Sequence, residues 1–378
     1  MPSPRRVWLA VAAMFFLNGG LFGTWASRIP TVAEHHNLDG GWLGLLLLVL
    51  ASGALISFPL AGRASDTFGA ARATLAIAVA YTLALVMIAC AFNLWLTAAA
   101  LFLFGAGHGA MDVTMNSWAG EAERFIAKPV MSSFHAMWSL GAGVGAAAGY
   151  MAVSLDLSLL THFSLIGITM YVSTILLGSI GWQSETRPRA AGAKRFPLPH
   201  GVLLWVGIIA LCASLGEGAI ADWSALFLVT VTSATTAQGA IGYAVFSLAM
   251  VIMRLIGGGV ISRLGPATAA RFAGCSAALG VLLAVLPANF MAALLGFFFL
   301  GIGYALIMPL AFSRAANDPD TPPGVAIASV ATLGYGGMLL GPPLIGFTAH
   351  FVTLHYAFGI LGFLALFIVF IAPSLERF

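Results

Sequence analysis

Residues 101–123 read LFLFGAGHGAMDVTMNSWAGEAE, an apolar run that is long enough to cross a membrane as a helix. Within this run His108, Asp112 and Asn116 recur every four residues, so they share one face of the helix. An ionisable side chain inside a membrane span usually faces a partner or a water-filled cavity, because exposure to lipid is costly. The stretch therefore predicts a membrane helix that carries a functional site around Asp112.

The rest of the chain has the composition of an integral membrane protein. Of its 378 residues, 60% are hydrophobic and 8% are charged, whereas a soluble domain carries about 25% charged residues. Apolar runs of about 20 residues, the length that crosses the hydrocarbon core, recur from end to end and leave no room for a soluble domain. We predict an all-α membrane protein with twelve transmembrane helices, at residues 7–28, 41–61, 73–93, 95–120, 131–153, 160–181, 201–227, 239–260, 268–287, 289–312, 325–349 and 355–373.

The basic residues indicate the orientation. Lys and Arg accumulate in cytoplasmic loops, and an N-terminus inside the cell places nearly all of them on that side, with Arg28 alone toward the outside. The first span is longer than the apolar part of a signal peptide, and no A-x-A-like cleavage site follows it, so we expect it to be retained. The sequence predicts a multi-pass protein of the bacterial inner (plasma) membrane with both termini in the cytoplasm.

The chain also contains an internal repeat. Residues 183–199, QSETRPRAAGAKRFPLP, are polar and predict a cytoplasmic linker between an N-terminal six-helix half, 1–182, and a C-terminal six-helix half, 200–378. Glycines in three regions match across the halves with one displacement of 196 residues, which indicates duplication rather than chance. The matches are Gly62 and Gly69 with Gly258 and Gly265, Gly105 and Gly107 with Gly301 and Gly303, and Gly141 and Gly145 with Gly337 and Gly341. Near the start of each half, Gly20 and Trp25 match Gly218 and Trp223 with a displacement of 198.

Because an even number of spans precedes the repeat, both halves have the same orientation in the membrane. This is the architecture of major facilitator transporters, whose halves rock around a site at the bilayer midplane. The loop after the second span reads GRASDTFGAAR, and its Gly62, Asp66, Gly69 and Arg72 resemble the signature loop of that superfamily. The resemblance implies a major facilitator fold.

Three further motifs resemble the MosC-like branch of this superfamily and, more distantly, the fucose permeases. They are FFLNGGLFGTWASRIP at 15–30, GHGAMDVTMN at 107–116 and FHAMWSLGAGVG at 134–145. The resemblance implies that Asp112 occupies the place of a membrane glutamate that is linked to protonation in the sugar permeases. Asn116 matches an asparagine one turn later.

Three residues are candidates for proton coupling. Asp112 is a candidate proton site, because burial favours the neutral form of a carboxyl group, and the alternative is a carboxyl that packs helices by bonding Asn116. Glu217, in the span at 201–227, is the second candidate. His108 is a candidate for relaying or tuning the proton, and its alternative is a plain hydrogen bond between helices.

Candidate solute-binding residues are polar or aromatic side chains within the apolar spans. For each of them the alternative is ordinary helix packing or hydrogen bonding, and for Arg28 it is snorkelling to the interface or an ion pair with Glu34. The candidates are Asn18, Trp25, Arg28, Asn116, His135, Trp138, Tyr304 and Tyr335.

Candidate gating residues lie near the cytoplasmic ends of the spans. Asp66 is expected to bond Arg72 or the N-terminal end of a neighbouring helix. Arg254 is expected to bond acidic groups or carbonyls across the seam between the halves, with snorkelling as its alternative. The loop glycines Gly62 and Gly69 complete this set.

Together these observations predict a secondary active transporter that moves a small polar solute, such as a sugar, cyclitol or amine-bearing derivative, by alternating access and proton symport. Two alternatives remain open: a proton-driven exporter, and a transporter-like sensor that binds without transport. Neither a phosphate-binding loop, a catalytic triad nor a metal cluster is visible, so the sequence does not indicate an enzyme. We expect a monomer in contact with lipid, driven by the proton gradient without a cofactor, and no nucleic-acid partner.

Overall fold

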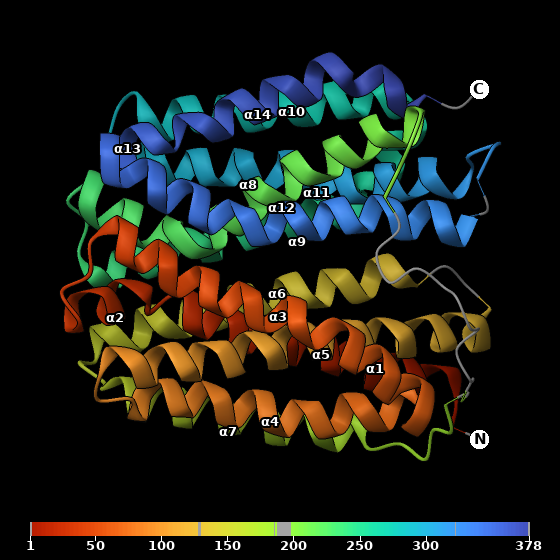
Figure 1. Cartoon of the computed structure of the whole chain (residues 1–378), viewed down its shortest axis with the longest axis horizontal. Helices are drawn as coiled ribbons and strands as arrows, with labels where there is room; N and C mark the ends of the chain where they lie inside the picture. The colour runs from red at the N-terminus through yellow and green to blue at the C-terminus, as the bar shows by residue number, and fades with distance from the viewer. Residues whose placement is uncertain (1, 128–129, 185, 187–197, 322, 377–378) are drawn as a thin grey trace. The chain divides into compact units, whose positions relative to one another are not determined.

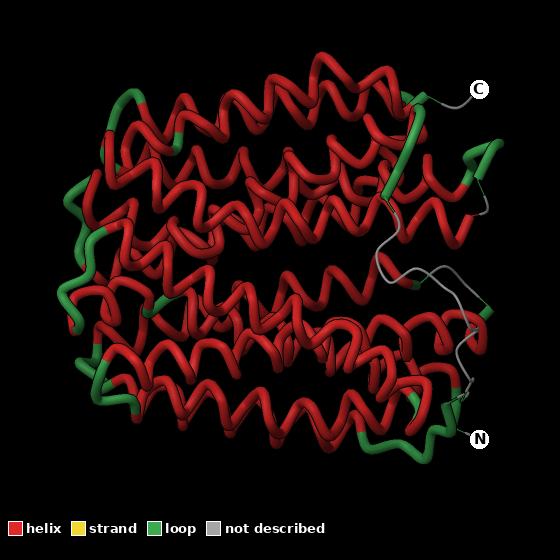
Figure 2. The backbone as a smooth tube through the Cα atoms, in the orientation of Figure 1, coloured by secondary structure: helices red, strands yellow, loops and turns green. Residues whose placement is uncertain are grey.

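The structure is a computed structural model, and it describes the chain except residues 1, 128–129, 185, 187–197, 322 and 377–378. The described residues form helices and loops, with no strand among them (Figure 2). Twelve helical segments in this part of the chain are long and apolar enough to cross a membrane. The predicted all-α membrane fold with twelve spans is therefore confirmed.

The N-terminal spans are long helices (Figure 1), and the helices predicted to end at residues 61 and 120 continue to Phe68 and Ile126. Gly62 and Asp66, predicted in a loop, therefore lie in the last turns of a helix. The first span, Pro4–His35, bends at a turn that precedes Pro30, because proline fits the first turn of a new helix but not the interior of an old one. The elements are α1 (Pro4–Ala26), α2 (Ile29–His35), α3 (Gly40–Phe68), α4 (Ala70–Cys90), α5 (Leu94–Ile126), α6 (Met131–Ser154) and α7 (Leu159–Gly178).

The C-terminal spans follow the same plan. The last of them is built from two helices and a short 3₁₀ turn rather than from one unbroken helix. The elements are α8 (Val202–Val231), α9 (Thr236–Leu264), α10 (Pro266–Val285), α11 (Phe290–Ala316), α12 (Pro323–Val352), α13 (Leu354–Ala357), α14 (Gly359–Ile371) and the 3₁₀ turn η1 (Ala372–Leu375).

Contacts group the chain into two compact units. The first comprises residues 1–37 and 46–193, and the second comprises residues 38–45 and 194–378. The start of α3 thus groups with the second unit, where Gly44 lies so close to Gly346 that an added Cβ would be 3.2 Å from its Cα. The predicted linker, 183–199, falls mostly outside the described residues.

Close contact through glycine recurs within each unit. In the first unit α1 packs on α6, and in the second α8 packs on α12. A Cβ added at Gly141 would meet the carbonyl of Phe16, and one added at Gly337 would meet the carbonyl of Leu211. Small residues let membrane helices approach until their backbones touch, so these two positions accept only glycine.

One predicted register between the halves is wrong. Gly23 faces the carbonyl of Ala142, and Gly218 faces the carbonyl of Met338. Since Ala142 and Met338 are related by the displacement of 196, these contacts make Gly218 the counterpart of Gly23, a displacement of 195 rather than 198. The error is three residues, which is almost one helical turn.

Helix ends show the same repetition. Asn93 caps α5 by accepting a hydrogen bond from the Leu96 amide, and Asn289, 196 residues later, caps α11 in the same way. Gly69 and Gly265 precede α4 and α10 with φ angles of 86° and 78°. Glycine adopts such positive φ angles without the steric cost that a side chain brings, so both turns require it.

Candidate solute and proton sites

Four side chains from four helices of the first unit form a hydrogen-bonded cluster, which we call the Asn18 cluster. Trp138 on α6 donates from Nε1 to Oδ1 of Asn18 on α1, over 2.7 Å. Asn18 donates from Nδ2 to the backbone carbonyl of His108 on α5, over 3.3 Å. The hydroxyl of Tyr81 on α4 lies 3.1 Å from His108 Nδ1. The cluster contains three predicted site residues, and Tyr81 joins them.

The cluster fixes the ring of His108 while leaving one nitrogen available. Tyr81 also donates to the backbone carbonyl of Asn18, over 3.4 Å. A hydroxyl has one proton, so the direction in which Tyr81 donates decides whether His108 Nε2 is a donor or an acceptor. The His108 ring packs on Phe22 with centroids 4.9 Å apart. Because His108 and Trp138 are half-buried, this ring nitrogen and the indole face are positioned to meet a polar solute.

Asp112 lies one turn beyond His108 on α5 and is half-buried. Asn116 donates from Nδ2 to the Asp112 carboxylate over 3.1 Å, and to its backbone carbonyl over 2.8 Å. An amide donor orients the carboxyl group without supplying a counter-charge. One turn earlier, Nδ1 of His108 lies 3.1 Å from the Tyr81 hydroxyl, and a role of His108 in relaying or tuning the Asp112 proton stays a prediction.

Arg28 lies in the turn between α1 and α2. Neither of the two alternatives given for it, snorkelling to the interface and an ion pair with Glu34, describes its position. Its side chain is 4% exposed, so it does not snorkel to the interface. Nη2 donates to the Leu157 carbonyl over 3.1 Å, and among the described residues Nε and Nη1 have no partner. The predicted alternative of an ion pair with Glu34 is therefore wrong, since Glu34 is exposed.

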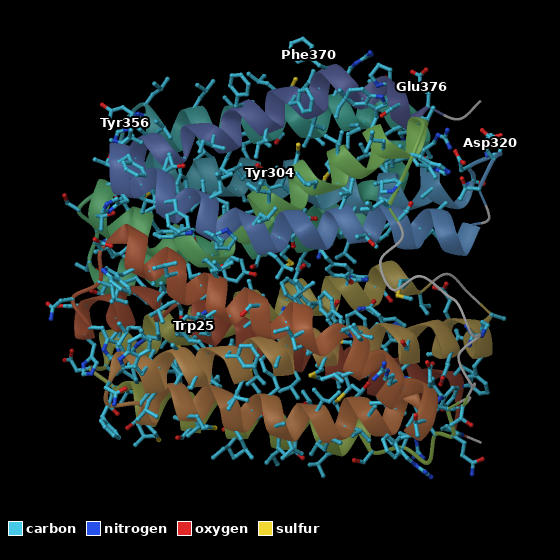
Figure 3. The ribbon with its side chains drawn as sticks, in the orientation of Figure 1. Trp25, Tyr304, Asp320, Tyr356, Phe370 and Glu376 are labelled. Atoms are coloured by element: carbon cyan, nitrogen blue, oxygen red, sulfur yellow. The ribbon has the colours of Figure 1, made fainter. Side chains whose placement is uncertain are left out.

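Two predicted solute-binding aromatics are core residues in this conformation. Trp25 is fully buried and packs on Phe104 with centroids 6.2 Å apart. Tyr304 is 1% exposed and lies against Gly216, where an added Cβ would meet its ring. Each of the two lies among the helices of its own unit (Figure 3). Helix packing, the stated alternative, therefore describes both positions.

His135 and Tyr335 remain more accessible. The ring of His135, on α6, is half-buried and meets Phe15 edge-on with centroids 5.3 Å apart. Tyr335, on α12, is 39% exposed. Both side chains are thus open enough to contact a solute.

The second unit contains an ion pair within the membrane spans. Arg254 on α9 lies 3.5 Å from Glu217 on α8, and their side chains are 10% and 13% exposed. We expected Arg254 to bond across the seam between the halves, but this partner belongs to its own half. The pair joins a predicted gating residue to a predicted coupling residue.

The signature loop is built differently from the prediction. In the described chain no ion pair joins Asp66, which is half-buried, to Arg72, which is exposed. Instead, Ser184 accepts a hydrogen bond from the Ala71 amide over 3.0 Å, at the N-terminal end of α4. A residue from beyond α7 thus satisfies one of the free amides at the start of α4. At Gly62 an added Cβ would meet open space.

Two residues of these sites were not predicted from the sequence. Tyr81 is the one tyrosine in the span at 73–93, and a phenol hydroxyl in an apolar helix is a signal that could have identified it. Ser184 lies in the polar stretch after α7, where nothing in the neighbouring residues indicates its partner.

The fold and these sites define a class of protein: a membrane protein with twelve helices, in the part of the chain that the structure describes, that are long and apolar enough to cross a bilayer and that carry polar groups inside them. A family model described as "Major Facilitator Superfamily" matches residues 7–323. The chain belongs to the major facilitator superfamily.

Relatives agree with this assignment. The chain is 46% identical over 98% of both lengths to "Uncharacterized transporter y4wD" of Sinorhizobium fredii. It is 34% identical to "Membrane protein MosC" of Rhizobium meliloti, over 93% of this chain and 86% of that one. The predicted resemblance to the MosC-like branch is confirmed, and the chain is a transporter rather than an enzyme.

Solved structures share the fold at low sequence identity. The nucleoside transporter NupG, in a mutant form, superposes with a TM-score of 0.77 at 12% identity, over 98% of this chain and 100% of that one. The D-xylose-proton symporter gives 0.73 at 15%, over 96% and 97%. The fucose:proton symporter of E. coli gives 0.65 at 15%, over the full length of both chains.

Proposed function

We propose that this transporter is a proton symporter of the bacterial inner membrane for a small polar solute, a sugar, cyclitol or amine-bearing derivative. The observation that carries the proposal is the Glu217–Arg254 ion pair, 3.5 Å apart and largely buried in membrane helices. A buried pair contributes little net stability, so a role in proton coupling accounts for it better than a structural role. Two transporters that share the fold are named as sugar–proton symporters.

The coupling step follows from the charges of this pair. When Glu217 binds a proton, it loses its attraction to Arg254, and the guanidinium is released to another partner. A conformational change that depends on this release is thereby linked to proton binding. Asp112, with its amide partner Asn116, is the second coupling site that we propose, because a charged carboxylate is costly to carry through an occluded state.

The Asn18 cluster is proposed as the solute site of the first unit. It presents an imidazole nitrogen and an indole face, which together suit a ring with hydroxyl groups. Hydrogen bonds to polar groups set the orientation of such a solute, and aromatic rings stack on its apolar face. His135, on α6 of the same unit, is proposed as a further contact, and Tyr335, on α12, is proposed as a solute contact of the second unit.

The solute class is tested first by a thermal-shift screen of purified protein with D-xylose, L-fucose, uridine and myo-inositol. A ligand that binds only the folded state raises the apparent stability. The compound that gives the largest shift is then used with proteoliposomes to measure uptake driven by an imposed pH gradient. Uphill uptake supports symport, solute expulsion indicates an exporter, and binding without exchange indicates a sensor.

The coupling site is tested on the same liposomes with Glu217→Gln and Asp112→Asn. Each amide mimics the protonated carboxyl, so the variant at the coupling site should exchange solute while losing uphill uptake. The double variant Glu217→Gln/Arg254→Gln guards against unfolding, because the single change leaves a buried arginine unpaired. Asp156→Asn, a carboxyl in an exposed turn, is the matched control. If both membrane variants still accumulate solute, neither carboxyl couples transport to protons.

Localisation and assembly complete the proposal. We propose that both termini are cytoplasmic and that the transporter acts as a monomer that needs only lipid and the proton gradient. A reporter enzyme fused at the C-terminus should be active in the cytoplasm, and a periplasmic signal would reverse the topology. Light scattering of the detergent complex should give the protein mass of one chain.

A further inference from the structure

One hydroxyl of the Asn18 cluster contacts two groups and has a single proton to give. Tyr81 on α4 is fully buried, and its oxygen lies 3.1 Å from Nδ1 of His108 and 3.4 Å from the backbone carbonyl of Asn18. The carbonyl can only accept hydrogen bonds, whereas a neutral imidazole has one nitrogen that donates and one that accepts. The proton of Tyr81 can therefore go to either group, and each choice fixes a different tautomer of His108.

The ring of His108 is held so that Nδ1, and not a carbon, meets the hydroxyl. Its centroid is 4.9 Å from that of Phe22 and 5.7 Å from that of Tyr81. A flipped ring would place a C–H group against the hydroxyl and lose the 3.1 Å contact. A charged imidazole inside a membrane span is costly, so the ring is neutral and carries its proton on one nitrogen.

The two tautomers differ by one hydrogen bond. If Tyr81 donates to Nδ1, its contact with the Asn18 carbonyl is not a hydrogen bond, and Nε2 carries the ring proton. If Nδ1–H donates to Tyr81, the hydroxyl donates to the Asn18 carbonyl, and both contacts are hydrogen bonds. The 3.4 Å bond is long, so by itself it favours this tautomer by at most about threefold. Hydrogen bonds in a chain strengthen one another, which adds to the preference.

We infer that Tyr81 is a positioning residue that holds His108 as the Nδ1–H tautomer and so makes Nε2 an acceptor toward the solute. The inference rests on the proposed use of the Asn18 cluster as the solute site. Nε2 then accepts from a hydroxyl or an N–H group of the solute. It rejects an ether oxygen or a fluorine at the same place, because a site built to bond a donor is left unpaired by a group that cannot donate. Tyr81 thus determines specificity without touching the solute.

The first test needs no solute. Solid-state nitrogen-15 NMR spectra of the protein in liposomes, labelled at the histidine rings, distinguish a protonated ring nitrogen from an unprotonated one. The signals of His108, identified by their loss in His108→Gln, should show a protonated Nδ1 and an unprotonated Nε2. A protonated Nε2 as the main form in the unmodified protein, alone or together with a protonated Nδ1, would overturn the inference.

Two tyrosine variants extend this test. In Tyr81→Phe the Nδ1–H group loses its acceptor, so the ratio of the Nε2–H to the Nδ1–H tautomer should rise by at least about threefold. Tyr150→Phe, a matched change at an exposed tyrosine of the same unit, should leave the ratio unchanged. Melting temperatures establish that each variant is folded. An unchanged ratio in folded Tyr81→Phe would show that Tyr81 does not select the tautomer.

The second test measures specificity. D-xylose, L-fucose, uridine and myo-inositol are compared with derivatives in which fluorine replaces one hydroxyl at a time, since fluorine is close to a hydroxyl in size but cannot donate. For a compound that binds, the derivative altered at the group facing His108 should bind about 10- to 100-fold more weakly. In Tyr81→Phe this ratio should fall to within about threefold. A role in packing alone would weaken the parent and the derivative equally, and an unchanged ratio would therefore overturn the inference.

The two proposals fail in different ways. If the Asn18 cluster is not the solute site, the NMR spectra still show Nδ1–H, but no fluorinated derivative responds to Tyr81→Phe because none of the compounds meets His108. If the cluster is the solute site but Tyr81 does not position His108, a compound binds and the spectra show a protonated Nε2.

Discussion

Replacing Asn18 by leucine should weaken the first unit by a calculable amount. The amide is fully buried and makes two hydrogen bonds, at 2.7 Å with Trp138 and at 3.3 Å with the His108 carbonyl. Hydrogen bonds between membrane helices average about 0.6 kcal/mol, so their loss costs about 1.2 kcal/mol. The unpaired indole N–H adds a penalty of about 1 kcal/mol. We expect the free energy of unfolding to fall by about 2 kcal/mol, because leucine has nearly the shape of asparagine and leaves little void.

A double-mutant cycle in mixed detergent micelles isolates the bond. Asn18→Leu and Trp138→Phe, alone and together, should give a coupling energy of about 0.6–1 kcal/mol. The control pairs Asn18→Leu with Trp8→Phe, which removes the bond from the Trp8 indole to Ser133 and should be additive. Coupling below about 0.3 kcal/mol for Asn18 and Trp138 would refute the reasoning.

Three further changes test separate features. Gly69→Ala should lower the free energy of unfolding by about 1 kcal/mol because residue 69 has a positive φ angle. Gly62→Ala should raise it by about 0.5–1 kcal/mol, because position 62 is helical and an added Cβ meets open space there. Equal melting temperatures of the two variants would contradict this. Gly216→Ala should cost about 1–3 kcal/mol by displacing Tyr304, and Tyr304→Leu should recover part of the loss. Burial, followed by the charge of the preceding histidine, lowers the pKa of His36, so folding disfavours its protonation and stability falls as pH drops below the ordinary histidine pKa. The melting temperature should therefore decrease more between about pH 8 and about pH 5 in the unmodified protein than in His36→Gln, and an identical decrease would exclude this residue as a cause.

The spans could be predicted because their signal is local and large. An apolar run of about 20 residues has no stable place other than a membrane or a large core. It was harder to predict the register of the internal repeat, that is, which residue of one half corresponds to which residue of the other. A displacement of 195 and one of 198 put the same helix face in contact, since three residues make almost one turn, and only the contacts of Gly23 and Gly218 distinguish them.

The sites could be predicted only in part. Asn18, His108 and Trp138 were recognisable as polar groups in apolar helices, and the structure brings them together. A membrane helix is apolar on all sides, so its sequence does not indicate whether an aromatic residue faces a cavity or the core. For this reason the sequence analysis placed Trp25 among the solute-binding residues. The Tyr81 hydroxyl meets a ring on another helix, and such a pairing exists only after the helices have assembled.

The matched helix ends have a consequence for the ancestry of the chain. Asn93 and Asn289 cap corresponding helices, and Gly69 and Gly265 make the same left-handed turn, yet the counterparts of Tyr81, His108 and Asp112 are Ala277, Tyr304 and Met308. Selection after the duplication event thus preserved the residues that end helices and released those that carry chemistry.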